Sequence, residues 1–342
     1  MTRPDRIAEF TETIWDWYAR HKRELPWRDL TLKDETERAY RILVSEVMLQ
    51  QTQVSRVIII YKRFLQEFPK LKDLAEASNR DVILAWRGMG YNSRALRLRD
   101  AARQILRRSE RQKGKGKREK NENIFPRAME ELISIPGIGH YTAAAIRNFA
   151  FHIPTPCIET NIRRVLHTAF FGPPKADGTW KVGDRKLLEL AEEVLEVALM
   201  FSSSESALAD ESRSVKGKNF STRPALAGLA RRERSKKTAD WHAALMDYGS
   251  LAIPKIKPKK KLIRKEPGRM VGSRYIPNRI FRGKIIEELR DAERGLSIHE
   301  IGRRVCIDWE PEEHSEWLQD LLKKLQKDTL LEKNGKKFFL CS

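Results

Sequence analysis

"LISIPGIGHYTAAAI", residues 132–146, is the stretch that decides the fold of this chain. A tight, uncharged turn from Pro136 to Gly139 separates two apolar segments that each have the spacing of a helix. Glycine adopts backbone angles that other residues resist, and proline fixes the start of the turn, so the two helices can meet in a hairpin. A second helix beginning near Tyr141 would present unpaired N–H groups that suit a phosphate. The turn therefore predicts a backbone surface that a polyanion can approach closely.

Helical spacing extends well beyond this turn. From Ile7 to Met200 apolar residues recur at the helical period, without a convincing strand alternation. We therefore expect an all-α main body. Two segments rich in charged residues or serine, 109–123 and 202–238, are expected to be flexible solvated insertions. They are either plain surface loops or segments that touch DNA phosphates.

The composition restricts the partners of the chain. Its 342 residues have room for about two domains, and 67 Lys+Arg against 47 Asp+Glu leave a net charge of +20. Such an excess attracts either nucleic acid or an anionic membrane surface. Nucleic acid is favoured, because no apolar run approaches the roughly 18 residues of a membrane span. The start, MTRPDRIAEF, lacks the apolar core of a signal peptide, so we expect a cytoplasmic protein, associated with the nucleoid or nuclear in a eukaryote.

The last part of the chain has a different character. Residues 254–276 form a basic, proline-containing stretch that we interpret as a linker. After it, RGKIIEELRDA, SIHEIGRRV and SEWLQDLLKKLQKDTL have the spacing of three short helices, and Asn334-Gly335 between two apolar arms indicates a β-hairpin. Residues 277–342 are therefore expected to form a winged-helix-like domain. Such modules bind either duplex DNA or other proteins, and both roles stay open.

Six motifs occur in one order along the chain. They are LPWRD (25–29), SEVMLQQTQV (45–54), WRGMGYNSRALRL (86–98), IPGIGHYTAAAI (135–146), ETNIRRVL (159–166) and ALMDYGS (244–250). Together they resemble the helix-hairpin-helix DNA glycosylases, and most closely the adenine glycosylases of the MutY type. The resemblance implies a glycosylase domain over residues 1–253, with two helical lobes, a cleft between them, and a hairpin that grips the DNA strand carrying the target base.

Glu46 is the candidate general acid. It shares one helical face with Ile42 and Leu49. A carboxyl held against apolar neighbours is hard to ionise, so its pKa rises and it can carry a proton near neutral pH. A residue at the edge of a half-buried helix would need no such role. The resemblance places at this position the acid that protonates the departing base.

The resemblance also assigns roles to Glu159 and Tyr141. Glu159 stands where the family has an aspartate that stabilises the sugar cation or activates water during N-glycosidic cleavage. The longer side chain is a departure, and a displacement of about 1 Å can cost roughly a hundredfold in rate, so inactivity or an altered substrate stays open. Tyr141 stands where bifunctional relatives carry a lysine, and a phenol cannot form a Schiff base with the opened sugar. We therefore expect a monofunctional glycosylase that leaves an abasic site.

Base recognition and DNA contact follow from the same motifs. Trp27, Arg28 and Asp247 match residues that line the adenine pocket, where an aromatic face, a guanidinium and a carboxylate can read a purine edge. Ala243 stands where the family has glutamine, so the choice of adenine stays open. The target base must also be rotated out of the stack. The expected DNA contacts are Gln50, Gln51, Tyr91, Pro136, Gly137, Ile138, Gly139, His140, Thr142, Asn161, Arg163 and Arg164.

Two features of typical relatives are absent from this sequence. Cys157, Cys306 and Cys341 are too few and too scattered for a disulfide framework or for the four-cysteine iron–sulfur cluster of most relatives, so we predict no cluster and no other metal. A monovalent cation bridging hairpin carbonyls and a phosphate stays open. The winged-helix-like tail is also not the Nudix-like domain that senses 8-oxoguanine in typical adenine glycosylases.

The leading hypothesis is a monofunctional base-excision glycosylase. Its expected partner is double-stranded DNA that contains a mispaired purine, namely adenine opposite 8-oxoguanine or guanine. We expect the protein to bind this DNA as a monomer and not to associate with a membrane. One alternative is a glycosylase for another damaged or mismatched base. A second is a non-catalytic helix-hairpin-helix and winged-helix DNA-binding protein. The acid at Glu46 argues against the second alternative, because a mere binder needs no carboxyl on an apolar face.

Overall fold

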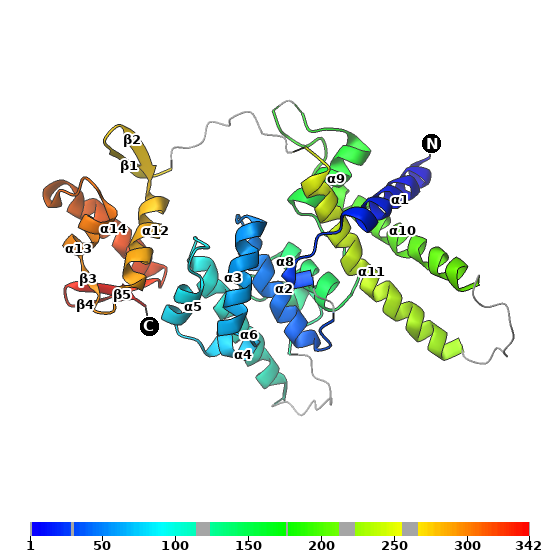
Figure 1. Ribbon diagram of the computed structural model, residues 1–342, viewed down its shortest axis with the longest axis horizontal. Helices are drawn as coiled ribbons and strands as arrows, with labels where there is room; N and C mark the ends of the chain where they lie inside the picture. The colour runs from blue at the N-terminus through cyan, green and yellow to red at the C-terminus, as the bar shows by residue number, and fades with distance from the viewer. Residues whose placement is uncertain are drawn as a thin grey trace. The chain divides into compact units, whose positions relative to one another are not determined.

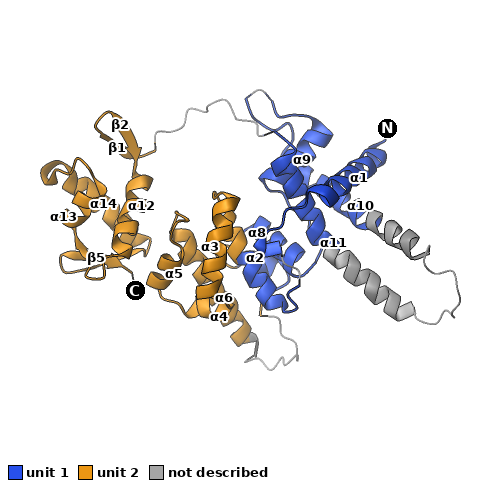
Figure 2. Ribbon diagram, in the orientation of Figure 1, with its two compact units in different colours: residues 1–43, 125–134, 138–261 blue, residues 44–124, 135–137, 262–342 orange. Residues whose placement is uncertain are grey.

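The computed structural model (Figure 1) describes residues 2–28, 31–113, 124–175, 177–211, 223–254 and 266–341, and the side chains of these residues apart from those between 201 and 236. The chain forms two compact units (Figure 2). Unit 1 consists of residues 1–43, 125–134 and 138–261, and unit 2 of residues 44–124, 135–137 and 262–342. In the part of the chain so described, no helix is both long and apolar enough to cross a membrane.

Unit 1 is built from helices. They are α1 (Arg3–His21), a 3-10 turn (Pro26–Arg28), the first part of α2 (Glu35–Leu49), α7 (Met129–Ile133), α8 (His140–Ala145), a π-helical turn (Ile146–Ala150), α9 (Thr160–Phe171), α10 (Asp184–Glu211) and α11 (Arg223–Leu251). Thr2 begins α1 with a capping box, in which its side chain accepts from the Asp5 N–H and the Asp5 carboxylate accepts from the Thr2 N–H. Helix α11 packs against α1, α9 and α10, and its buried Trp241 contacts the Trp15 ring at 5.3 Å between centroids.

Unit 2 combines a helical lobe with the C-terminal module. The lobe contains the rest of α2 with α3 (Val54–Glu67), α4 (Leu71–Glu76), α5 (Asn79–Ala85) and α6 (Ser93–Lys113). The module contains β1 (Gly268–Val271), β2 (Arg274–Pro277), α12 (Asn278–Arg290), β3 (Leu296–Ser297), α13 (Ile298–Val305), α14 (Pro311–Lys327), β4 (Leu331–Asn334) and β5 (Lys337–Leu340). Apolar residues of α12, α13 and α14 form its core.

The C-terminal module has the element order expected from the sequence. Three helices are followed by the antiparallel pair β4–β5, whose turn contains Gly335 at φ +58°, and β3 joins β5 to give the strand order β3-β5-β4. Ser297 and Glu300 cap α13 reciprocally. The expected linker, however, needs correction, because residues 268–277 form the β1–β2 hairpin. Residues 255–265 of that linker lie outside the described residues.

Parts of the two expected flexible insertions are helical. Helix α6 continues to Lys113, and α10 and α11 include residues 202–211 and 223–238. The remaining residues, 114–123 and 212–222, are not described. A charged or serine-rich composition therefore did not prevent helix formation here, because alanine, glutamate, lysine and arginine are good helix formers. The all-α main body is confirmed, since each regular element in the described residues before 255 is helical.

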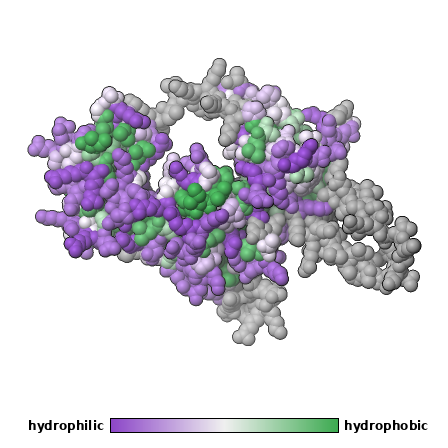
Figure 3. Space-filling model, viewed as in Figure 1, coloured by the Kyte–Doolittle hydropathy of each residue, from purple (hydrophilic) through white to green (hydrophobic). Residues whose placement is uncertain are grey.

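The described surface is mostly hydrophilic on the face drawn in Figure 3, in keeping with the excess of lysine and arginine. A few large apolar side chains are exposed nonetheless. One of them is Tyr91, which keeps 52% of its surface accessible. This tyrosine lies in the short loop between α5 and α6.

Candidate functional site

The hairpin turn between α7 and α8 exposes its backbone. Ile135 and Ile138 are buried, at 3% exposure each, and anchor the turn. Gly137 has φ +96°, which favours glycine, whereas Gly139 is extended and precedes α8 as its N-cap residue. The helix begins at His140, one residue earlier than expected. The exposed residues of the turn are Pro136, Gly137, Gly139 and His140.

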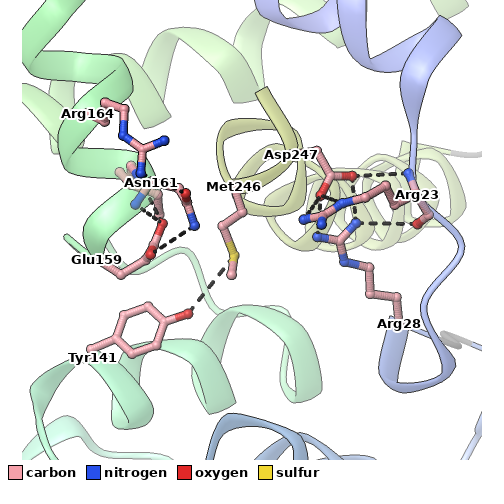
Figure 4. Close-up of polar contacts among 9 residues, drawn as sticks. Arg23, Arg28, Tyr141, Glu159, Asn161, Arg164, Met246 and Asp247 are labelled. Carbon is pink, nitrogen blue, oxygen red and sulfur yellow. Dashed lines mark hydrogen bonds and ion pairs between the residues drawn. The ribbon is translucent and has the colours of Figure 1, made fainter. Parts of the chain in front are cut away.

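Glu159 is the N-cap residue of α9 (Figure 4). Its Oε1 accepts hydrogen bonds from the backbone N–H groups of Asn161 at 2.7 Å and Ile162 at 2.8 Å, and its Oε2 accepts one from Asn161 Nδ2 at 3.3 Å. Burial raises the pKa of the Glu159 carboxyl, and these hydrogen bonds oppose the rise without cancelling it. The glutamate is therefore a half-buried, oriented carboxyl at the positive end of a helix.

Helices α9 and α11 approach each other closely beside Glu159. A Cβ atom at Gly249 would lie 2.6 Å from the Asn161 carbonyl oxygen, so only glycine fits there. Arg164 donates from Nη1 to the Gly249 carbonyl at 2.6 Å and from Nη2 to Asn161 Oδ1 at 3.4 Å. Arg164 is 8% exposed and its guanidinium joins two helices, whereas its contact with phosphate stays a prediction.

The structure also describes the surroundings of three other expected DNA contacts. Thr142 and Ile138 are buried, at 5% and 3% exposure, so their side chains do not face the solvent. Arg163 lies in the first turn of α9, with its side chain 20% exposed, and pairs with Asp184, one of the two contacts being 2.8 Å long. That pair lowers the pKa of Asp184 through the hydrogen bond from Arg163.

Asp247 lies at the centre of an arginine cluster (Figure 4). Its side chain is fully buried, and Arg28 binds it in a bidentate pair with both contacts at 2.8 Å. Arg23 adds a contact of 2.7 Å from Nε and one of 3.1 Å from its backbone N–H. Burial by itself would raise the pKa of Asp247, but the hydrogen bonds and charges of Arg28 and Arg23 hold it below its usual value. The structure thus brings Arg28 and Asp247 together, as the sequence suggested.

Tyr141 points toward α11 (Figure 4), where its hydroxyl lies 4.0 Å from the sulfur of Met246. Sequence reasoning missed Met246 and Arg23. A carboxylate in the apolar segment ALMDYGS signals that some cation must pair with it. Nothing in the sequence singles out Arg23 as that cation, and Met246 carries no signal besides its place next to Asp247. Trp27, in the 3-10 turn beside Arg28, is 7% exposed.

Glu46 belongs to the lobe of unit 2 and lies on α2. It is 7% exposed, and every residue from Ile42 to Met48 is buried. The helix therefore buries its whole circumference in this stretch rather than one face. A carboxyl in the middle of such a segment is not an edge residue, which the sequence had left open.

Two loops with unusual backbones lie on unit 2. Gln51, two residues after the end of α2, has φ +54°, and Tyr91, before α6, has φ +47°. Such angles are uncommon for residues other than glycine and concentrate at functional sites. Arg94 connects the loops by donating to the Met48 and Met89 carbonyls, each at 3.3 Å, and to Thr52 Oγ1 at 3.1 Å. This arginine lies in the motif WRGMGYNSRALRL, but the motif alone does not indicate its role. Gln50, the other expected contact, is exposed.

The absence of an iron–sulfur cluster stays a prediction that rests on the number of cysteines in the sequence. The sequence holds three of them, one fewer than a four-thiolate cluster requires. Cys157 and Cys306 are buried and Cys341 is half-buried. Within the described ranges, no group of three histidine, cysteine, aspartate or glutamate side chains is placed to hold a metal ion.

Comparison with known proteins supports the resemblance. Residues 44–193 match the family described as "HhH-GPD superfamily base excision DNA repair protein". The chain is 42% identical over 163 residues to an adenine DNA glycosylase of Mus musculus, which covers 47% of this chain and 29% of that protein. It is 37% identical over 172 residues to an adenine DNA glycosylase of Mycobacterium tuberculosis, covering 50% of each chain. The chain thus spans half or less of the length of these relatives.

A solved thermostable thymine-DNA glycosylase is also similar, with a TM-score of 0.49 and 23% identity, covering 75% of this chain and 91% of that one. The matched residues 44–193 include Glu46, the hairpin turn, Tyr141 and Glu159. Over that range the chain is similar to the HhH-GPD superfamily of base excision DNA repair proteins.

Proposed function

We propose that the protein is a monofunctional DNA glycosylase that excises adenine mispaired with 8-oxoguanine or guanine. The observation that carries this proposal is the buried carboxyl of Glu46 within the buried segment Ile42–Met48 of α2. Its position inside the range that matches the superfamily, and identities of 37–42% to adenine DNA glycosylases, support the choice of reaction and base. The proposed partner is double-stranded DNA, bound by a monomer in the cytoplasm, or in the nucleus of a eukaryote.

The proposed reaction is hydrolysis of the bond between the sugar C1′ and the purine. Glu46 donates a proton to a ring nitrogen of the base, and the C1′–N bond breaks with its electron pair going to the base. The carboxylate of Glu159 stabilises the oxocarbenium-like sugar, and a water molecule adds to C1′ while losing a proton to that carboxylate. The hydrogen bonds from the first turn of α9 fix the orientation of Glu159 before substrate binds.

The arginine cluster refines the proposed base pocket. Both oxygens of Asp247 are already bound by Arg28 and Arg23, so this carboxylate is occupied in the structure. We assign to Asp247 the positioning of Arg28, whose guanidinium and the ring of Trp27 would then contact the purine. This differs from the sequence-based expectation, in which Asp247 itself accepted a hydrogen bond from the base.

The reaction can be tested with a panel of duplexes. These carry adenine opposite 8-oxoguanine, adenine opposite guanine, uracil, thymine opposite guanine, or hypoxanthine, and each is treated with hot alkali after incubation to reveal abasic sites. Strand cleavage is expected for the two adenine mispairs after alkali. Cleavage without alkali would contradict the monofunctional assignment to Tyr141. Tight binding without excision of any base would instead identify a non-catalytic binder.

Replacing Gly137 with valine should weaken binding to duplex DNA by about tenfold. A β-branched residue at φ +96° strains the turn by about 1–3 kcal/mol. This strain should shift the backbone that we propose contacts phosphate. Affinity is measured by fluorescence anisotropy at fixed ionic strength. Gly178→Val is the matched control, since Gly178 also has a positive φ, of +82°, in a turn outside the hairpin. Unchanged affinity in Gly137→Val would contradict the phosphate-clamp role.

The pH dependence of the excision rate should report the ionisation of the Glu159 carboxyl. Its carboxylate must be ionised to stabilise the sugar cation, and burial raises its pKa. The rate is therefore expected to fall, as the pH decreases, through a pKa above the ordinary value for glutamate. Single-turnover rates with wild type are compared with those of Glu159→Gln, in which this limb should disappear together with most of the activity. An acid limb at or below the ordinary value would contradict the assignment.

A further inference from the structure

Unit 2 contains a cavity that the proposed reaction does not use. It has a volume of about 710 Å³, inside the range of about 300–1,000 Å³ that is typical of ligand pockets. The loops before α3 and α6 form one wall, and α12 with the end of α14 forms the other. The lining residues that matter here are Gln51, Tyr91, Arg279, Arg282 and Gly283.

The C-terminal module is held firmly against the lobe at this place. Ile83 of α5 and Leu96 of α6 belong to the same apolar core as Phe281 and Ile286 of α12. Arg290, which is 5% exposed, donates from Nη2 to the Ile83 carbonyl and to Asn92 Oδ1, both at 3.1 Å.

Two further contacts flank this core. Arg87 binds Asp291 with distances of 3.0 and 2.6 Å, and Asn79 Nδ2 donates to the Thr329 carbonyl at 3.2 Å. The module is therefore a fixed wall of the cavity, and Arg290 fixes the residue next to Tyr91.

The chemistry of the cavity suits a nucleotide. The Tyr91 ring is 52% exposed and can stack on a base, and Gln51 supplies amide donors and acceptors. Arg279 and Arg282 of α12 provide positive charge, each next to a carboxylate, with Glu266 at 3.3 Å from Arg279 and Asp328 beside Arg282. The positive φ angles of Gln51 and Tyr91 place strained backbone at the same wall.

We propose that this cavity binds one unstacked nucleotide of the bound DNA, with the base against Tyr91 and the phosphate near Arg279 and Arg282, so that the C-terminal module is part of the DNA site. This inference rests on the proposed function in one respect, namely that the loops of Gln51 and Tyr91 enter the duplex. The nucleotide is either the former partner of the target base or one of its neighbours in the same strand.

Gly283 offers a direct test, because it lines the cavity on α12 and a Cβ added there would meet no atom within 4 Å. Gly283→Trp should therefore fill the cavity without disturbing the module, and Gly283→Glu should place a negative charge where we expect phosphate. Gln319→Trp and Gln319→Glu are the matched controls, since Gln319 is exposed on α14 and does not line the cavity. Thermal denaturation checks that all four variants fold.

The readout is the fluorescence of 2-aminopurine, which rises when this base leaves the stack. It is placed in turn opposite the target and at each neighbouring position in that strand. The target nucleotide is 2′-deoxy-2′-fluoroadenosine, whose glycosidic bond resists hydrolysis. With wild type and both controls, fluorescence should rise at one of these positions. Gly283→Trp should abolish the rise, and both Gly283 variants should bind this duplex about tenfold more weakly.

The position that responds identifies which nucleotide enters the cavity. No rise at any position with wild type, or an unchanged rise and affinity in both Gly283 variants, would overturn the proposal. Because the duplex is not cleaved, these outcomes are independent of excision. A protein that fails to excise adenine but shows the Gly283-dependent rise would refute the proposed function and keep the nucleotide site.

Discussion

Glu46→Gln is expected to abolish base excision while leaving the affinity for a mispaired duplex nearly unchanged. Glutamine keeps the shape of the side chain and its burial in α2 but cannot donate an acidic proton to the leaving base. General acid catalysis contributes about 10²–10⁴-fold, so the single-turnover rate should fall by at least about a hundredfold. The measurement is alkali-revealed cleavage of an adenine:8-oxoguanine duplex under enzyme excess.

Anisotropy titration of the same duplex provides the second half of this test. A variant that loses both excision and binding would point to a structural role for Glu46, and a variant that stays fully active would show that the acid is misassigned. Glu37→Gln is a suitable control, because Glu37 also lies on α2 but pairs with Arg41 at the surface, with its side chain 35% exposed. That control should excise adenine at nearly the rate of wild type.

Asp247→Asn is expected to lower the free energy of unfolding by about 3 kcal/mol. The substitution removes the only anion seen between Arg28 and Arg23 among the described contacts, and breaking a buried pair costs about 3–5 kcal/mol. The lower end applies because the Arg23 side chain is 24% exposed, so water can solvate part of it. Chemical denaturation at neutral pH measures the difference from wild type.

The pair should also give stability a definite pH dependence. Since the pKa of Asp247 is lower in the folded chain, its stabilising contribution is fully present above the unfolded value and is lost as the pH falls through the folded value. Wild type and Asp247→Asn should therefore converge in stability under acidic conditions. Asp184→Asn, which removes the exposed partner of Arg163, is the control and should cost about 1 kcal/mol or less. A cost for Asp247→Asn as small as that of the control would contradict the buried-pair interpretation.

Local sequence signals predicted much of this architecture. The Pro-Gly-Ile-Gly turn, the helical period and Asn334-Gly335 depend on residues close together in the chain, and the hairpin, the helical body and the β4–β5 pair follow from them. The burial of Glu46 was likewise visible in the apolar residues around it.

Contacts between distant segments were not predictable in the same way. Arg23 and Asp247 are 224 residues apart, and Arg290 and Asn92 are 198 apart. Each of these arginines looks like any solvated arginine until the packing of the helices brings it to its partner. Arg164 is a similar case, because its basic side chain suggested phosphate, whereas the structure buries it between α9 and α11.

The cap at the start of α9 ties chemistry to folding. Oε1 of Glu159 holds two backbone N–H groups, and it holds them best while the carboxylate is charged. In the proposed reaction this carboxylate takes up a proton from water, and protonation weakens the hydrogen bonds that it accepts from the first turn of the helix. The full strength of these hydrogen bonds returns when the proton leaves. The N-terminus of the helix therefore favours the ionised form of Glu159, which is the form that the next turnover needs.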